Sequence, residues 1–124
     1  MKILIVEDDA LVAKALIRMV SSFFTGCEFI YAENGAEGLI ATKGKVLDLV
    51  ITDINMPVMN GLEMVKLLRG QGHTIPILVM TAGVGLLQQE MLELNQAGII
   101  QGMFDKPWKI STVTALIEKA IMSK

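Results

Sequence analysis

The stretch LVITDINMPVMNGLE, residues 49–63, carries the clearest structural signal in the chain. It begins as a short run of branched apolar residues leading to Asp53, continues through a loop with Pro57, and reaches Asn60, a residue type that commonly caps a helix. The pattern predicts a buried strand, a loop and the start of a helix, in that order. A strand followed by a helix is the unit from which parallel sheets are built.

The same alternation of short Val- and Ile-rich runs with longer amphipathic segments extends over the whole chain. The expected strands are Lys2–Val6, Glu28–Ala32, Leu47–Thr52, Ile77–Met80 and Gly102–Asp105. The expected helices are Ala10–Ser22, Ala36–Lys43, Gly61–Arg69, Leu86–Gln96 and Ile110–Met122. The alternation predicts an α/β fold with a doubly wound, five-stranded parallel sheet and helices on both faces. Ligands of such folds bind beyond the carboxyl ends of the strands.

The size and composition of the chain fit one domain. Its 124 residues are enough for one core and too few for two, so residues 1–124 are expected to form a single domain. Apolar residues make up 52% of the sequence and charged residues 19%, which suits a sheet covered on both faces. The formal net charge is −2 and Lys and Arg do not cluster, so direct binding to nucleic acid is not expected.

Neither a targeting segment nor a membrane span is expected. The longest strongly apolar stretch, Ile75–Leu87, is interrupted by a proline and two glycines and is shorter than the roughly 20 residues that cross a bilayer. The N-terminus lacks the length and cleavage site of a signal peptide, which indicates a cytoplasmic location. A single cysteine, Cys27, and a single histidine, His73, exclude an internal disulfide and a Cys/His zinc site.

Charged and hydroxyl side chains gather where the expected strands end. Acids follow the first and third strands, a threonine ends the fourth and a lysine follows the fifth: Glu7, Asp8, Asp53, Thr81 and Lys106. Neighbouring central strands would bring the three acids together, and each pair would repel by about 1 kcal/mol even in a watery medium. Lys106 supplies one compensating charge. A hard divalent cation with oxygen ligands, Mg²⁺ above all, would supply the rest.

Four motifs make this pattern specific. They are ILIVEDD at 3–9, LVITDINMPVMNGLE at 49–63, VMTA at 79–82 and DKPW at 105–108. In this order they resemble the motifs of the response-regulator receiver family of two-component signalling, which comprises CheY-like domains, and the resemblance spans the chain. It implies a flavodoxin-like (βα)5 fold with strand order 2-1-3-4-5. It also implies a signalling domain that is not itself an enzyme.

The resemblance assigns the phosphoacceptor and the metal ligands. Asp53 would be the nucleophile that accepts a phosphoryl group from the histidine of a sensor kinase, from a phosphotransfer protein or from a small donor. Asp8 would bind Mg²⁺ directly, Glu7 through water, Asp53 through its carboxylate and Asn55 through its backbone carbonyl. The third acid of ILIVEDD, Asp9, is expected to start the first helix instead.

The resemblance also assigns residues that respond to the phosphoryl group. Lys106 and the Thr81 hydroxyl would contact its oxygens, and Thr81 would move toward them. Receivers usually have an aromatic residue three positions before the lysine, which turns inward when the threonine moves. Here that position is Met103, which is flexible enough to repack. The adjacent Phe104 is expected to point to the opposite side, into the core.

Loop residues and a partner surface complete the expectations. Pro57 and Gly61 would fix the loop after Asp53, and Pro107 would hold a bend that is commonly cis in the family. The fourth helix is apolar on more than one face, through Leu86, Leu87, Met91, Leu92 and Leu94, with Val84 before it. Such a helix marks either a homodimer or partner surface between the fourth and fifth helices, or a helix buried by the segment that follows.

The expected partners are a sensor histidine kinase or phosphotransfer protein, and an effector or C-terminal output domain outside this sequence. A receiver-like module that binds partners without phosphorylation would be expected to lack one of the five strand-end residues, all of which are present. A haloacid-dehalogenase enzyme would need a second aspartate where this chain has Asn55. A flavodoxin-type electron carrier would need a phosphate-binding loop where residues 7–9 are acidic.

Overall fold

The computed structural model describes residues 1–83 and 85–122, in which five strands alternate with five helices. The strands are β1 Lys2–Val6, β2 Glu28–Ala32, β3 Leu49–Asp53, β4 Ile77–Thr81 and β5 Gly102–Asp105. The helices are α1 Ala10–Phe23, α2 Gly35–Thr42, α3 Gly61–Gly70, α4 Leu86–Gln96 and α5 Ile110–Met122. The predicted alternation is confirmed. β3 begins at Leu49, two residues later than expected. Both β3 and β4 end one residue later than expected, so that Asp53 and Thr81 are the last residues of their strands.

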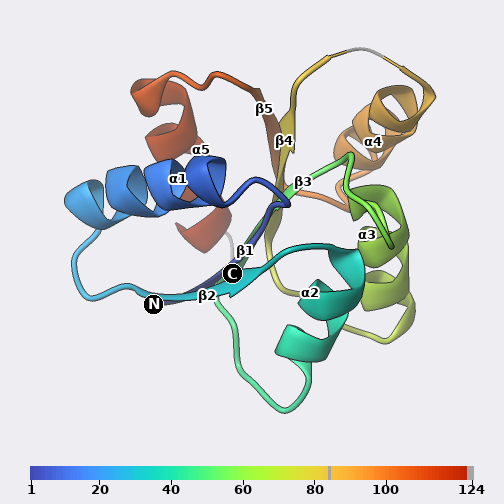
Figure 1. Ribbon diagram of the computed structural model, residues 1–124, viewed down its shortest axis with the longest axis horizontal. Helices are drawn as coiled ribbons and strands as arrows, with labels where there is room; N and C mark the ends of the chain where they lie inside the picture. Colours follow the sequence, from blue (N-terminus) through green and yellow to red (C-terminus); the bar gives the residue numbers. More distant parts are fainter. Residues whose placement is uncertain (84, 123–124) are drawn as a thin grey trace.

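The strands form one sheet in the order β2-β1-β3-β4-β5, and every neighbouring pair is parallel. The predicted fold class and strand order are therefore confirmed. Figure 1 shows α1 and α5 on one face of the sheet and α2, α3 and α4 on the other. In the described part of the chain, no helix has the length and apolar character needed to cross a membrane.

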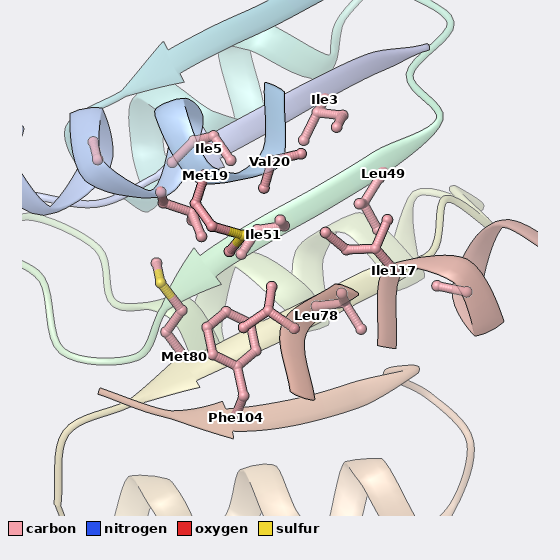
Figure 2. Packing of buried hydrophobic residues seen from close by; sticks show 14 residues of the cluster. Ile3, Ile5, Met19, Val20, Leu49, Ile51, Leu78, Met80, Phe104 and Ile117 are labelled. Carbon is pink, nitrogen blue, oxygen red and sulfur yellow. The ribbon is translucent and has the colours of Figure 1, made fainter. Parts of the chain in front are cut away.

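Alternate residues of the central strands fill two apolar layers, one under each set of helices. The layer beneath α1 and α5 is shown in Figure 2 and includes Ile3, Ile5, Ile51, Leu78 and Phe104. The opposite layer, beneath α2, α3 and α4, includes Leu4, Val6, Val50, Val79 and Met91. Burial of one such side chain stabilises the fold by about 1.5–3 kcal/mol. The two layers explain the high apolar content, because each central strand is covered on both faces.

Three helices begin at residues that accept hydrogen bonds from the first turn. The carboxylate of Asp9 caps α1, and the side-chain oxygens of Asn34 and Asn60 cap α2 and α3. The shortest N–O distances at the three caps are 2.9, 3.0 and 2.9 Å. Each cap satisfies a backbone N–H that has no partner within its helix. The prediction that Asp9 starts the first helix is confirmed.

Candidate functional site

The register of the sheet brings the acids together. Val6 of β1 pairs with Thr52 of β3, so the residues that follow them, Glu7 and Asp53, lie side by side at the carboxyl edge. Asp8 comes next in the chain, and one carboxylate oxygen from each of Glu7, Asp8 and Asp53 lies within 4.8 Å of the others. The convergence predicted from the strand ends is therefore confirmed.

Asp53 is held in one orientation by two donors. Its Oδ1 accepts a hydrogen bond from the Ile54 backbone N–H at 2.8 Å, and its Oδ2 lies 3.0 Å from Nζ of Lys106. The residue is 7% exposed, so bulk water screens these contacts little. Lys106 directly follows β5, and its backbone N–H donates to the carbonyl of Thr81 at the end of β4 at 2.8 Å. This hydrogen bond fixes the position of Lys106 beside the end of β4.

Glu7 is fully buried, and its carboxylate has two partners. Oε1 is hydrogen-bonded to the Lys106 ammonium, and Oε2 accepts from the backbone N–H of Asp9 at 3.2 Å. The pKa of Glu7 is raised from 4.5 to about 7: burial is the largest cause, Lys106 opposes it, and the nearby acids Asp8 and Asp53 contribute to the rise. The pKa of Lys106 is also raised: burial lowers it, but hydrogen bonds and charge attraction from Glu7 and Asp53 prevail.

This donor set fits a small, hard divalent cation. Two of the three carboxylates are buried and one, Asp8, is exposed, so a cation at this edge would meet protein oxygens on one side and water on the other. In the described residues, no other group of three acidic, His or Cys side chains converges in this way. Asn55 lies two residues after Asp53 and lines a hollow of about 350 Å³ together with Thr81 and Gly83.

The residues expected to respond to the phosphoryl group surround this edge. Thr81 ends β4, is 6% exposed, and donates its hydroxyl to the carbonyl of Gly83 at 3.2 Å. Met103 packs against the layer under α3 and α4 and lines a hollow of about 260 Å³. Phe104 lies in the opposite layer. Its ring is edge-on to the Trp108 ring, with 6.3 Å between the two ring centroids. The predicted opposite placement of Met103 and Phe104 is confirmed.

Gly61 packs directly against the end of β3. Its N–H donates to the carbonyl of Ile54 at 2.7 Å. A Cβ at this position would lie 2.2 Å from the carbonyl oxygen of Asp53, far inside van der Waals contact. Only a residue without a Cβ can pack this closely against β3. This steric requirement explains the structural role expected for Gly61.

Two of the three prolines, Pro57 and Pro107, stand in loops that border the site. Pro57 accepts a hydrogen bond from the N–H of Met59 at 2.8 Å, which closes a three-residue turn around Val58. Val58 has φ = 68°, a left-handed conformation that is unfavourable for a β-branched residue. Pro107 follows a cis peptide bond with Lys106, as the receiver resemblance implied.

One contact in the site was not anticipated from the sequence. The hydroxyl of Tyr31 in β2 donates to the backbone carbonyl of Glu7 at 2.7 Å. Strand alternation and the pairing of Tyr31 with Ile5 predict the face of the sheet on which its ring lies. They do not predict that its hydroxyl binds this particular carbonyl.

Fold and site together define a CheY-like class of α/β signalling domain.

Comparison with known proteins identifies the family. Residues 3–118 match the family model for the response regulator receiver domain. The chain therefore belongs to the response regulator receiver family, which confirms the prediction from its four motifs. Proteins of this family are signalling modules.

The chain spans less than half the length of the two curated relatives described next. It is 33% identical over 120 residues to the DNA-binding transcriptional regulator NtrC of Escherichia coli, covering 94% of the chain and 24% of NtrC. It is 39% identical over 117 residues to the response regulator MprA of Mycobacterium tuberculosis, covering 92% of the chain and 47% of MprA. The receiver domain of a histidine kinase from Syntrophus aciditrophicus superposes with a TM-score of 0.83 at 26% identity, covering 98% and 90% of the two chains.

Proposed function

We propose that residues 1–124 form one receiver domain that acts in cytoplasmic two-component signal transduction and is phosphorylated on Asp53. The observation that carries this proposal is the environment of the Asp53 carboxylate. It is buried, hydrogen-bonded to Lys106, and within 4.8 Å of ligand oxygens of Glu7 and Asp8. Such a carboxylate is an oriented nucleophile beside a cation, with room for a second cation at the exposed edge.

In the proposed reaction, a carboxylate oxygen of Asp53 forms a bond to phosphorus while the bond from phosphorus to a kinase histidine nitrogen breaks. The product is an acyl phosphate on Asp53 and a free histidine. Lys106 keeps its proton and offsets the charge on the phosphoryl oxygens. Asp8, Asp53, the Asn55 carbonyl and, through water, Glu7 would hold Mg²⁺, which supplies further positive charge when bound.

The proposed response begins at Thr81. Its hydroxyl bonds to the Gly83 carbonyl, at the same edge as Asp53, and would exchange this acceptor for a phosphoryl oxygen. The loop after Thr81 would then move, and the hollow beside Met103 gives this flexible side chain space to repack. The phosphoryl group thus acts through local hydrogen bonding and packing.

The direct test is incubation with Mg²⁺ and acetyl phosphate followed by intact mass spectrometry. One added phosphoryl group is expected in the wild type, and none in Asp53→Asn or in the presence of a chelator. Absence of the adduct in the wild type would contradict the proposal and favour an interaction module that works without phosphorylation. Beryllofluoride with Trp108 fluorescence provides an independent measure, since Trp108 lies two residues from Lys106.

A sensor kinase or phosphotransfer protein is the proposed upstream partner. An apolar hollow of about 460 Å³ lies beside the site, between α1 and the loop after β5, and Leu11, Val12 and Trp108 contribute to it. Leu11 is 76% exposed, although it stands in the first turn of α1 next to the acids. A partner helix covering this hollow would bring its phosphohistidine close to Asp53. Leu11→Glu should slow transfer from a kinase but not phosphorylation by acetyl phosphate.

The edge of the sheet at β5, with α4 on one side and α5 on the other, is the proposed surface for an effector or a second copy. Leu86 is 85% and Leu92 40% exposed, whereas Met91 is buried, so part of the apolar character predicted for this helix faces outward. Val84 lies outside the described residues. Sedimentation with and without beryllofluoride tests self-association, and a monomer in both states would contradict it. Any C-terminal output domain of the whole protein belongs to the same proposal.

A further inference from the structure

A side-chain hydrogen bond from β2 joins the backbone just beyond the end of β1, in addition to the backbone hydrogen bonds between the two strands. The last paired residues are Val6 and Ala32, and the N–H of Glu7 continues the ladder by donating to the Ala32 carbonyl at 3.0 Å. The carbonyl of Glu7 lies beyond this ladder and accepts from the Tyr31 hydroxyl at 2.7 Å. A side chain of β2 therefore replaces the backbone donor that a longer strand would have supplied.

This carbonyl belongs to the peptide that joins Glu7 to Asp8. On the other side, the Asp9 N–H donates to Oε2 of Glu7, and the Asp9 carboxylate caps α1. The backbone of Asp8 is therefore held between two fixed points, although its side chain is exposed. Of the three carboxylates in the cluster, that of Asp8 is the one whose position depends most on its backbone, because the other two are also buried.

The chemistry of a phenol suits this place. Tyr31 is 39% exposed and stands next to an acidic cluster, where a lysine would add positive charge and compete with a divalent cation. A neutral hydroxyl donates one hydrogen bond and leaves the charge of the cluster unchanged. Partners that orient ligands in this way commonly account for a tenfold or greater effect on metal affinity.

We propose that Tyr31 is a positioning residue for the metal site: its hydroxyl sets the Glu7–Asp8 peptide and thereby the direction from which the Asp8 carboxylate reaches a divalent cation. The inference rests on the proposed Mg²⁺-dependent function and adds a residue that the receiver motifs do not contain. Mg²⁺ requires near-ideal octahedral geometry, whereas Ca²⁺ tolerates irregular ligands. Loss of the hydroxyl therefore affects Mg²⁺ more than Ca²⁺.

The test is Tyr31→Phe, which removes only the hydroxyl oxygen. The dissociation constants for Mg²⁺ and Ca²⁺ are measured by calorimetry, and the free fraction of Mn²⁺ by electron paramagnetic resonance. We expect the Mg²⁺ constant to rise roughly tenfold and the Ca²⁺ constant to rise less. A Mg²⁺ constant within about twofold of the wild-type value, or equal losses for the two cations, would overturn the proposal.

A matched control separates positioning from stability. Phe29→Leu changes a side chain two residues earlier on β2 that packs on the same apolar layer as Ile5. It should lower the urea midpoint in chelator and leave the Mg²⁺ constant unchanged. In Tyr31→Phe, the amide ¹⁵N shift of Asp8 should change in the metal-free protein, which reports directly on the Glu7–Asp8 peptide.

The outcomes also separate this inference from the proposed function. Wild-type protein that binds Mg²⁺ and is phosphorylated on Asp53, together with unchanged binding in Tyr31→Phe, would overturn the role of Tyr31 alone. Wild-type protein that binds no Mg²⁺ would overturn both.

Discussion

Nζ of Lys106 lies 3.0 Å from Oδ2 of Asp53 and is also hydrogen-bonded to Oε1 of Glu7. One ammonium group thus joins the acid that follows β1 to the acid that ends β3. Both carboxylates are buried, with side-chain exposures of 1% for Glu7 and 9% for Asp53, and the lysine side chain is 17% exposed. The stability of this edge therefore depends on Lys106 when no metal is bound.

Replacement of Lys106 by methionine should destabilise the metal-free protein at pH 8. Removing one partner of a buried pair costs about 3–5 kcal/mol, and here two acids lose their cation. Urea unfolding measures the change. Lys66→Met is the matched control, because Lys66 and Glu90 form an exposed pair with side chains 58% and 50% exposed, worth at most about 1 kcal/mol. Equal losses of unfolding free energy in the two variants would show that the buried ion pairs contribute no more to stability than the exposed pair.

The raised pKa of Glu7 predicts a pH dependence with a definite sign. Its folded pKa of about 7 exceeds the ordinary value of 4.5, so the folded state holds a proton that the unfolded state has released. The metal-free protein should therefore lose stability as the pH rises from about 4.5 to 7, by an amount on the order of 2–3 kcal/mol. Glu7→Gln should flatten this part of the profile. Chemical unfolding in chelator at several pH values is the measurement.

Mg²⁺ should reverse this trend, because it binds carboxylates and competes with protons. The increase in melting temperature caused by Mg²⁺ is expected to be larger at pH 8 than at pH 6. A larger increase at pH 6 would contradict the assignment of Glu7 to the metal site. Asp53→Asn and Asp8→Asn should each reduce the increase at pH 8.

Gly61→Ala should destabilise the fold by about 1–3 kcal/mol, since its Cβ would press on the Asp53 carbonyl oxygen. Gly70→Ala is the natural comparison, because the same helix is changed and, apart from the chain neighbours and the helix's own backbone, no described atom lies within 4 Å of the added carbon. That substitution should be neutral or stabilising by up to about 1 kcal/mol. Calorimetry of the two variants measures the change in stability. Unchanged stability in Gly61→Ala would mean that the loop relaxes freely around the added carbon.

Val58→Gly should stabilise the protein, contrary to the usual effect of glycine. Val58 is 84% exposed and has φ = 68°, a conformation that costs a β-branched residue about 1–3 kcal/mol. Val46 is equally exposed, at 85%, and does not have a positive φ. Val46→Gly should therefore lower stability slightly through the entropy of the unfolded chain. In thermal unfolding, the melting temperature is expected to rise in Val58→Gly and to fall in Val46→Gly. A change of the same sign in both variants would show that Val58 is unstrained.

Gly83 predicts a short-lived phosphoryl group. It lies two residues beyond Thr81 and is exposed, and it has no side chain to shield the phosphoryl from water. Apart from the two chain neighbours, a Cβ added here would have no described atom within 4 Å, so a larger side chain has space. Gly83→Arg should slow the decay of phosphorylated Asp53, which can be followed by mass spectrometry after removal of the donor. Gly70→Arg, at an exposed site in α3, should leave the decay unchanged. Faster decay in Gly83→Arg would contradict the prediction.

Much of the fold and site could be predicted because the signals are local. Branched apolar runs indicate strands, and Asp9, Asn34 and Asn60 cap helices through contacts with the next few residues of the same chain. The alternation of strands and helices indicated a parallel sheet, and the carboxyl ends of such strands share one edge. Glu7, Asp8, Asp53, Thr81 and Lys106 could therefore be assigned to one site before any distance was known.

The remaining features arise between segments that are far apart in the sequence. The burial that raises the pKa of Glu7, the sharing of Lys106 between two acids and the bond from Tyr31 to the Glu7 carbonyl all require strands in register. The turn at Val58 has a positive φ that a β-branched residue disfavours, and the loop that contains it leads to Gly61 beside Asp53. Local pattern determined which residues meet at this edge, whereas packing decided their protonation, orientation and strain, because those depend on distances that only the folded sheet sets.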